Sequence, residues 1–227
     1  MARTIDIEQR AVRREAFVDT AERLFRTQGY ADTSIQDILD ALGASRGAFY
    51  HYFGSKTELL EAVTDRVVTT AIAAAMPVVE DPVLSAPEKL EGLFRSIQRW
   101  KELRADLMLG LLGAWLSDDN ALMREKYRRG VQAALIPPLT SIAEQGITEG
   151  SFEATSAEGV ARGIVHVVLG LQEQVIQLYV DRHDGLVTFD DVWRILSPYP
   201  GIFERIAGLR PGSFQIADET TLRQWFG

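Results

Sequence analysis

The sequence of 227 residues contains no cysteine and only three histidines. Without cysteine, disulfides, thiol catalysis and cysteine-based zinc sites are excluded. Three histidines leave little material for any other metal site, so we expect neither a metal nor a cofactor. A chain without cysteine also fits a reducing compartment, and we expect a cytoplasmic protein.

Long continuous apolar runs are missing as well. The first 17 residues contain no apolar stretch typical of a signal peptide. The longest apolar runs, near Ala71–Val79 and Ile164–Leu171, are broken or too short to cross a bilayer. With 46% apolar and 25% charged residues, the composition is that of an ordinary globular chain. We therefore expect a soluble, intracellular protein with no membrane partner.

Positive charge is scarce too. The net charge is −8, and residues 1–60 hold eight basic against nine acidic side chains. A basic domain, the usual footprint of a nucleic-acid-binding protein, is therefore absent. Basic residues do gather locally: Arg10, Arg13 and Arg14 lie near the N-terminus, and Arg46 and Lys56 bracket a short segment. Charge alone decides neither for nor against nucleic-acid binding.

What the sequence does contain is helical periodicity along almost its whole length. Apolar residues recur at helical spacing, and no segment alternates with period two for long enough to propose a sheet. The predicted fold class is all-α, with helices over residues 9–27, 33–42, 46–52, 55–75, 87–104, 105–117, 119–146, 155–182 and 188–208.

Prolines at 77, 82 and 87 mark the expected domain boundary, and Pro77 is expected to end the fourth helix. Residues 1–76 are predicted to form an N-terminal helical domain, and residues 77–227 a C-terminal helical domain. The stretch 211–227 has few periodic cues and is expected to pack as a tail.

Capping signals divide the first domain. Thr33 and Gln36 match a capping box that begins the second helix, and Gly43 ends that helix after about two turns. Ser45 is placed to cap a third, short helix. A further capping box over residues 55–58 opens the fourth helix.

Two short helices joined by a tight glycine-containing turn are what a helix-turn-helix requires. The third helix begins with small residues around one long cation, Arg46, which suits entry into a major groove. Phe49 and Phe53, four residues apart, share one face and are expected to pack on the first two helices. Tyr50 and His51 then point elsewhere, where they can bond phosphates or base edges.

These residues resemble the N-terminal signature of the TetR (tetracycline-repressor) family. The resemblance covers about residues 9–65, spans three helices and both turns, and departs at Ala44, where the family often has a larger aliphatic residue. It rests on Gly29-Tyr30, Thr33-Ser34-Ile35-Gln36-Asp37-Ile38 and Ser45-Arg46-Gly47-Ala48-Phe49-Tyr50-His51-Tyr52-Phe53-Gly54-Ser55-Lys56.

The resemblance implies a transcriptional regulator, most often a repressor. Residues 1–76 would form its N-terminal three-helix helix-turn-helix domain, which binds DNA, and residues 77–227 its C-terminal helical domain for ligand binding and dimerisation. Two copies would read a roughly palindromic, double-stranded operator DNA, and a small-molecule effector bound in the C-terminal domain would release it. The residues that the resemblance places at DNA are Thr33, Ser34, Ser45, Arg46, Gly47, Ala48, Tyr50, His51 and Lys56. Among them Arg46 is the best candidate for a base contact, because a guanidinium can bond guanine O6 and N7 together.

An effector site is predicted around the apolar segment 107–116. A helix that is apolar all round must be buried, and here it could line a pocket for an apolar or amphipathic effector. The candidate lining residues are Met108, Leu112, Trp115, Tyr127 and His166. Ordinary core packing explains these residues equally well, His166 included. Pro137-Pro138 are expected to kink their helix near Leu135.

A homodimer interface is predicted on the two helices that follow residue 155. Their apolar stripes, with Gly159, Gly163 and Gly170 allowing close approach, suit a symmetric four-helix contact. Burial within a single chain is the alternative reading of the same stripes.

Two other function classes are open to an all-helical chain of this kind. An enzyme could draw on Asp118, Asp119, His166, Glu173 and His183, but their spacing supplies no nucleophile–base pair and no metal motif. A helical adaptor that keeps the helix-turn-helix shape without binding DNA has no need for Arg46 and Lys56 around a small-residue surface. We therefore expect no enzymatic activity.

Overall fold

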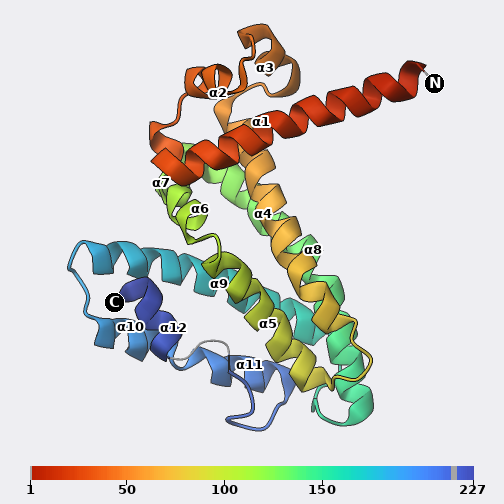
Figure 1. Ribbon diagram of the computed structural model, residues 1–227. Helices are drawn as coiled ribbons and strands as arrows, with labels where there is room; N and C mark the ends of the chain where they lie inside the picture. The colour runs from red at the N-terminus through yellow and green to blue at the C-terminus, as the bar shows by residue number, and fades with distance from the viewer. Residues whose placement is uncertain (1, 216–218) are drawn as a thin grey trace. The chain divides into compact units, whose positions relative to one another are not determined.

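The structure, a computed structural model, describes residues 2–215 and 219–227, and side chains from residue 8 onward. Within these ranges every regular element is a helix (Figure 1), which confirms the all-α prediction. The helices are α1 (Ala2–Asp32), α2 (Ile35–Leu42), α3 (Arg46–Tyr52), α4 (Lys56–Val79), α5 (Ala86–Glu102), α6 (Ala105–Gly110), α7 (Leu112–Leu116), the 3-10 turn η1 (Asp118–Asn120), α8 (Ala121–Glu149), α9 (Ala157–His183), α10 (Phe189–Leu196), α11 (Tyr199–Ala207) and α12 (Glu219–Phe226).

The chain forms two compact units. The first unit holds the residues up to Thr70 together with Lys101–Gly130, and the second unit holds Ala71–Trp100 together with the residues from Val131 onward. Two stretches distant in sequence thus fold together in the first unit. The division into functional domains at residue 77 stays a prediction, and it does not coincide with these compact units.

In the first unit α1 is the element on which the others pack. Its inner face buries Phe17, Val18, Ala21 and Phe25, each at most 2% exposed. The helices α2, α6 and α7 all contact α1. At Gly110, the last residue of α6, the backbone lies so close to the carbonyl group of Phe25 that a side chain would not fit between them.

Prolines do not end the helices in which they occur. The prediction that Pro77 ends the fourth helix is wrong, because α4 continues to Val79. Val79 is buried and Val78 packs directly over Gly92 of α5, so tertiary contacts hold the last turn. Helix α8 likewise runs through Pro137-Pro138, and the kink predicted near Leu135 does not interrupt it.

Two segments that were each predicted as a single helix form two helices in the structure. The segment 105–117, predicted as one helix, forms α6 and α7 with a break at Leu111, and the segment 188–208 forms α10 and α11. The predicted tail contains a further helix, α12. Its Phe226 packs with Leu178 of α9 and Val192 of α10 in one apolar cluster of the second unit.

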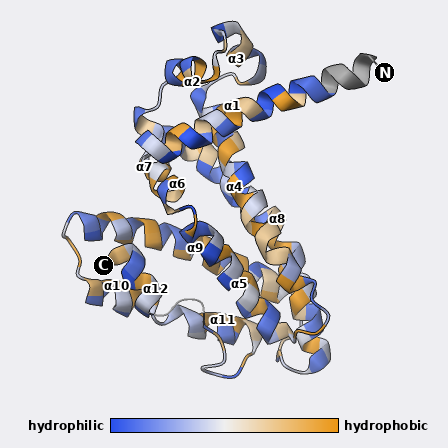
Figure 2. Cartoon of the chain, viewed as in Figure 1, coloured by the Kyte–Doolittle hydropathy of each residue, from blue (hydrophilic) through white to orange (hydrophobic). Residues whose placement is uncertain are grey.

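Two helices, α4 and α9, are long and apolar enough to cross a membrane by length and composition alone. The continuous apolar runs within both helices are nevertheless short, because polar and charged residues interrupt them. Core helices of globular proteins pass the same test, and α4 contributes the buried Leu59, Leu60 and Val63 to the protein interior. Both helices also carry hydrophilic residues between their hydrophobic ones (Figure 2).

Candidate nucleic-acid interface

Helix α2 begins one residue later than its sequence signal predicts. Its N-cap is Ser34, whose hydroxyl accepts from the backbone N–H of Asp37, and the Asp37 carboxylate accepts from the backbone N–H of Ser34 at 2.7 Å. The predicted box of Thr33 and Gln36 is wrong. The carboxylate of Asp37 also accepts from the Ser34 hydroxyl, and these bonds lower its pKa below the ordinary value.

Thr33 has a different role. It is 1% exposed, and its hydroxyl donates to the carbonyl oxygen of Gly29 at 2.6 Å. Gly29 leaves helical geometry, with φ 84° and ψ 157°, so its carbonyl needs a partner from outside the regular helical ladder. The predicted contact of the Thr33 side chain with DNA therefore has no support in this geometry. Gly29 forms a kink that separates the long first part of α1 from a short last turn.

The turn between α2 and α3 follows the prediction. Gly43 adopts the left-handed conformation (φ 65°, ψ 33°), which costs a residue without Cβ little. Ser45 then caps α3, and its hydroxyl accepts from the N–H of Ala48 at 3.2 Å. The cap and the bounds of the short third helix are thus confirmed.

The inner face of α3 is anchored on α1 by aromatic rings. Phe49 and Phe53 are at most 1% exposed, and each meets Phe17 edge to face with ring centroids 5.7 and 6.2 Å apart. Edge-to-face pairs of this kind add to the stabilisation by burial. The predicted core role of these phenylalanines is confirmed, and it fixes which face of α3 points outward.

The outer face of α3 presents small and polar groups. Ser45, Arg46, Gly47 and Tyr50 are exposed, and Ala48 is half-buried. Among the described residues, Arg46 makes no hydrogen bond or ion pair with its side chain. Its guanidinium is therefore available to a ligand with acceptor atoms. The outer face has the shape and the donor groups that a major groove accommodates.

His51, at the C-terminal end of this face, is also exposed, but it has a partner. Its Nε2 lies 2.8 Å from a guanidinium nitrogen of Arg10 in α1. The sequence places Arg10 among several N-terminal arginines and gives no sign of this pairing, because the two residues are 41 positions apart.

Lys56 is drawn inward. Its ammonium donates to the carbonyl oxygen of Tyr30 at 2.6 Å and lies 4.1 Å from the centre of the Tyr30 ring. Burial lowers the pKa of Lys56, while Asp32 and Asp37 oppose that shift. Lys56 thus ties the start of α4 to the end of α1. Its contact with a phosphate stays a prediction.

Two backbone N–H groups near Lys56 already have partners. The N–H of Gly54 donates to the Glu58 carboxylate at 2.6 Å, and the N–H of Glu58 donates to the Ser55 hydroxyl at 3.1 Å. The predicted capping box is therefore confirmed for the Ser55 hydroxyl, which accepts from Glu58. The Glu58 carboxylate accepts from the N–H of Gly54 and not from that of Ser55. A carboxylate at this end of α4 also repels a phosphate.

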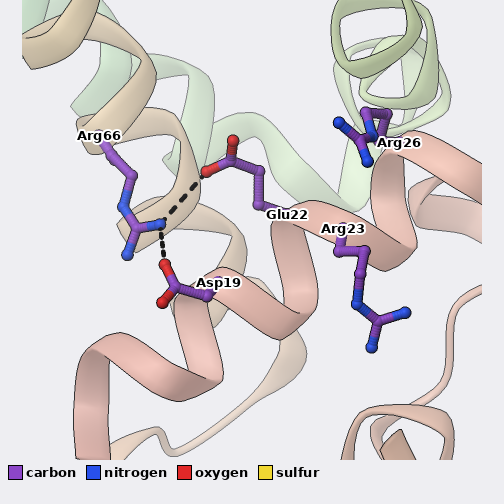
Figure 3. A pocket seen from close by; sticks show the side chains of 5 residues that line it. All are labelled: Asp19, Glu22, Arg23, Arg26 and Arg66. Carbon is purple, nitrogen blue, oxygen red and sulfur yellow. Dashed lines mark hydrogen bonds and ion pairs between the residues drawn. The ribbon is translucent and has the colours of Figure 1, made fainter. Parts of the chain in front are cut away.

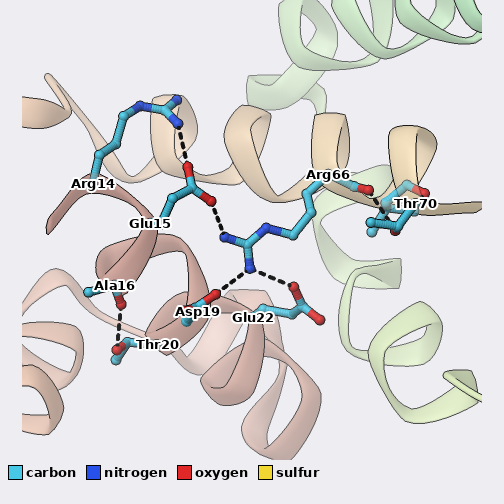
Figure 4. Close-up of polar contacts among 9 residues, drawn as sticks. Arg14, Glu15, Ala16, Asp19, Thr20, Glu22, Arg66 and Thr70 are labelled. Atoms are coloured by element: carbon cyan, nitrogen blue, oxygen red, sulfur yellow. Dashed lines mark hydrogen bonds and ion pairs between the residues drawn. The ribbon is translucent and has the colours of Figure 1, made fainter. Parts of the chain in front are cut away.

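A second polar contact between α4 and α1 lies outside this face. Arg66 bonds the carboxylates of Glu15 and Asp19 at 2.6 and 2.5 Å and reaches Glu22 at 3.3 Å (Figure 4). Burial lowers the pKa of Arg66, but the bonds to Asp19 and Glu15 outweigh it, and the pKa lies above its ordinary value. Figure 3 shows this guanidinium in a small pocket that Arg23 and Arg26 also line.

The candidate effector residues belong to both compact units. Trp115 and Tyr127 meet edge to face at 4.6 Å, and Met108 and Leu112 are half-buried in the same unit. His166 belongs to the second unit, is exposed, and uses Nδ1 to bond the Arg162 carbonyl at 2.8 Å. It is thus neither a core histidine nor aimed into a described pocket. The effector site stays a prediction.

Burial of the segment around these residues is incomplete. Leu109 and Leu116 are 41% and 48% exposed, so the expectation of a helix buried all round is wrong. The break at Leu111 divides the segment into α6 and α7, and both helices contact α1. Among the described residues, no group of three or more His, Asp or Glu side chains is arranged to hold a metal ion.

The predicted dimer stripe on α9 is divided. Val160, Ile164 and Leu178 are buried within the chain, whereas Val167 and Val168 are partly exposed. Gly163 is covered by Ile206 of α11, and Gly170 faces open space. Burial within the chain accounts for the first three residues, and the homodimer interface stays a prediction.

We expect Ser34→Ala to raise the pKa of Asp37 toward its ordinary value and to cost about 1 kcal/mol of stability, as loss of an N-cap usually does. Folding lowers the pKa of Asp37, so the capping box stabilises the folded state fully at pH values above the ordinary carboxyl pKa. This stabilisation is lost as the pH falls through the lowered pKa. An NMR titration of the Asp37 carboxyl group measures the shift.

Helix α10 offers a matched control. Thr188 and Asp191 form the same capping box there, which lowers the pKa of Asp191 to about 2. Thr188→Ala should raise the pKa of Asp191 and leave that of Asp37 unchanged. An unchanged Asp37 pKa in Ser34→Ala would contradict the assigned cap.

Several known proteins are similar in sequence to parts of this chain. A family model described as "Bacterial regulatory proteins, tetR family" matches residues 17–63. The HTH-type transcriptional repressor KstR2 of Mycolicibacterium smegmatis is 33% identical over 150 residues, which are 63% of this chain and 69% of that protein. The HTH-type transcriptional regulator EthR of the same species is 28% identical over 145 residues, 56% of this chain and 66% of that protein.

Other matches are shorter or agree in fold alone. The HTH-type transcriptional repressor Rv1474c of Mycobacterium tuberculosis is 31% identical over 42% of this chain and 54% of its own length. The chain thus spans about half to two thirds of the first two curated relatives it matches. A solved TetR transcription regulator from Haloarcula marismortui superposes with a TM-score of 0.59 at 23% identity, covering 87% of this chain and 97% of that one.

Proposed function

This chain belongs to the TetR family of bacterial regulatory proteins, and from that premise we propose that it is a sequence-specific DNA-binding transcriptional regulator. One observation carries the proposal. Helix α3 is anchored on α1 by Phe49 and Phe53 and turns its small, polar face outward around a guanidinium without a partner in the described structure.

In the proposed complex α3 enters the major groove. Arg46 contacts a base, and guanine suits it best because O6 and N7 accept two parallel bonds. Ser45, Gly47 and Ala48 allow the backbone to approach the base edges. Ser34, Tyr50, His51 and Lys56 would contact phosphates and fix the register of α3 on the duplex.

The proposal extends to assembly and regulation. Two copies would bind a roughly palindromic operator, since a symmetric dimer presents two equal reading helices. Two of the three curated relatives named above are repressors, which supports repression as the activity. An apolar or amphipathic effector would release the DNA. The protein would act in the cytoplasm, and the net charge of −8 would keep its other faces off DNA.

Other functions have less support. The related proteins are regulators and not enzymes, and the Asp, Glu and His side chains weighed for an enzyme form no described cluster. A helical adaptor does not require an exposed arginine on a small-residue helix.

Selection of bound fragments from a random DNA library by the purified full-length chain tests the proposal. The expected result is one enriched sequence with two related half-sites, whose affinity falls steeply with salt because phosphate contacts release counterions. The adaptor alternative predicts no enrichment and no salt-dependent affinity, and that result would overturn the proposal.

A further inference from the structure

Arg10 and His51 come from different helices and meet at the edge of the reading face. The distance between the guanidinium nitrogen of Arg10 and Nε2 of His51 is 2.8 Å, and both side chains are exposed. An arginine side chain has only donors and stays protonated in proteins. Nε2 of His51 must therefore be the acceptor, so His51 is neutral and carries its proton on Nδ1.

The fold holds Arg10 in this place. Positions 10, 14 and 17 lie four and three residues apart, on one face of α1. Phe17 packs on Phe49 and Tyr52 of α3, and the Arg14 guanidinium lies 5.0 Å from the centre of the Phe53 ring. The face of α1 that packs on α3 therefore also places Arg10 beside the last turn of α3.

The partner of Arg10 distinguishes it from neighbouring arginines. Arg14 pairs with the Glu15 carboxylate at 3.3 Å, and Arg66 is surrounded by three carboxylates. An imidazole that accepts a hydrogen bond is neutral, so the charge of Arg10 is not cancelled by this partner. Arg10 keeps its positive charge, and four of its five N–H groups can reach other acceptors.

We propose that Arg10 and His51 form a two-residue phosphate clamp at the edge of α3. Arg10 positions the His51 ring and fixes its tautomer, so that Nδ1–H of His51 and the remaining N–H groups of Arg10 donate to the DNA backbone. This inference rests on the proposed DNA-binding function and adds α1 to the DNA-contacting surface. Bonds between a guanidinium and a phosphate are charge-assisted and strong.

A double-mutant cycle tests the clamp on the DNA fragment selected by the wild-type protein. We expect Arg10→Ala to weaken binding about tenfold or more, since hydrogen bonds to charged groups are worth at least that much. In a His51→Ala background the same change should cost clearly less, because the two residues act together. Equal cost in both backgrounds would overturn the clamp.

Arg13→Ala is the matched control. It removes the same charge from the same exposed side of the chain's first helix, but no contact joins Arg13 to His51 in the described structure. Its effect should be the same with and without His51. An equal coupling of Arg13 with His51 would show a general charge effect and would overturn the specific pairing.

A second measurement needs no DNA. Nitrogen-15 NMR of the imidazole should show His51 with its proton on Nδ1 in the wild-type protein, and a mixture of tautomers in Arg10→Ala. A proton on Nε2 in the wild-type protein would overturn the clamp even where DNA binding is found. Absence of specific DNA binding with the expected tautomer would instead overturn the proposed function, and the clamp with it.

Discussion

Gly110→Ala is expected to destabilise the protein by about 1–3 kcal/mol, the usual cost of forcing an extra group into a packed contact. Within a helix, alanine is normally favoured over glycine by about 1 kcal/mol, so the expected sign opposes local propensity. The reason is tertiary: a methyl group at Gly110 would collide with the carbonyl oxygen of Phe25, which belongs to the backbone of α1 and cannot rotate away. Thermal unfolding followed by circular dichroism measures the effect.

Gly113→Ala is the control for this prediction. A methyl group there would lie 3.6 Å from Cβ of Ala31, an ordinary van der Waals contact. Gly113 lies within α7, so alanine should be neutral or slightly stabilising. If both variants unfolded at the same temperature as the wild-type protein, the close approach of α6 to α1 would be refuted.

Arg46→Ala is expected to weaken operator binding by about 1–3 kcal/mol, or roughly 5- to 150-fold, and to relax the preference at one base pair of each half-site. The Arg46 side chain is exposed and makes no described contact within the protein, so its removal should leave stability unchanged. A loss of affinity would therefore report a lost contact with DNA. Fluorescence anisotropy with operator variants at each position measures both affinity and preference.

Two controls separate base reading from charge. Arg46→Lys keeps the positive charge but not the two parallel donors, so it should retain the salt dependence and lose the base preference. Arg26→Ala removes the same charge from an exposed position of α1 away from α3, and it should leave the base preference intact. An unchanged preference in Arg46→Ala would remove this residue from the base-reading role.

Local signals predicted the reading face well. The cap at Ser45, the left-handed Gly43 and the spacing of Phe49 and Phe53 each act within a few residues, and each is confirmed. The start of α2 was one residue off because Thr33 and Ser34 both match a capping pattern. Only the tertiary burial of Thr33, with its hydroxyl on Gly29, decides between them.

Contacts between distant residues could not be predicted from the sequence. Lys56 bonds a carbonyl 26 positions away, and His51 bonds Arg10 at 41 positions. Proline alone suggested an end to the fourth helix, but the packing of Val78 over Gly92 outweighs the lost hydrogen bond. The apolar pattern around Trp115 fits a pocket and a core equally, so it identified no effector site.

Protection of guanine N7 from methylation by dimethyl sulfate tests the central claim, that α3 reads bases in the major groove, most directly. N7 lies in that groove, so a bound reading helix shields it. We predict two protected clusters in the selected operator, about one helical turn or a multiple of it apart, and loss of a protected guanine in each cluster with Arg46→Ala. Tight binding without any N7 protection would contradict the claim.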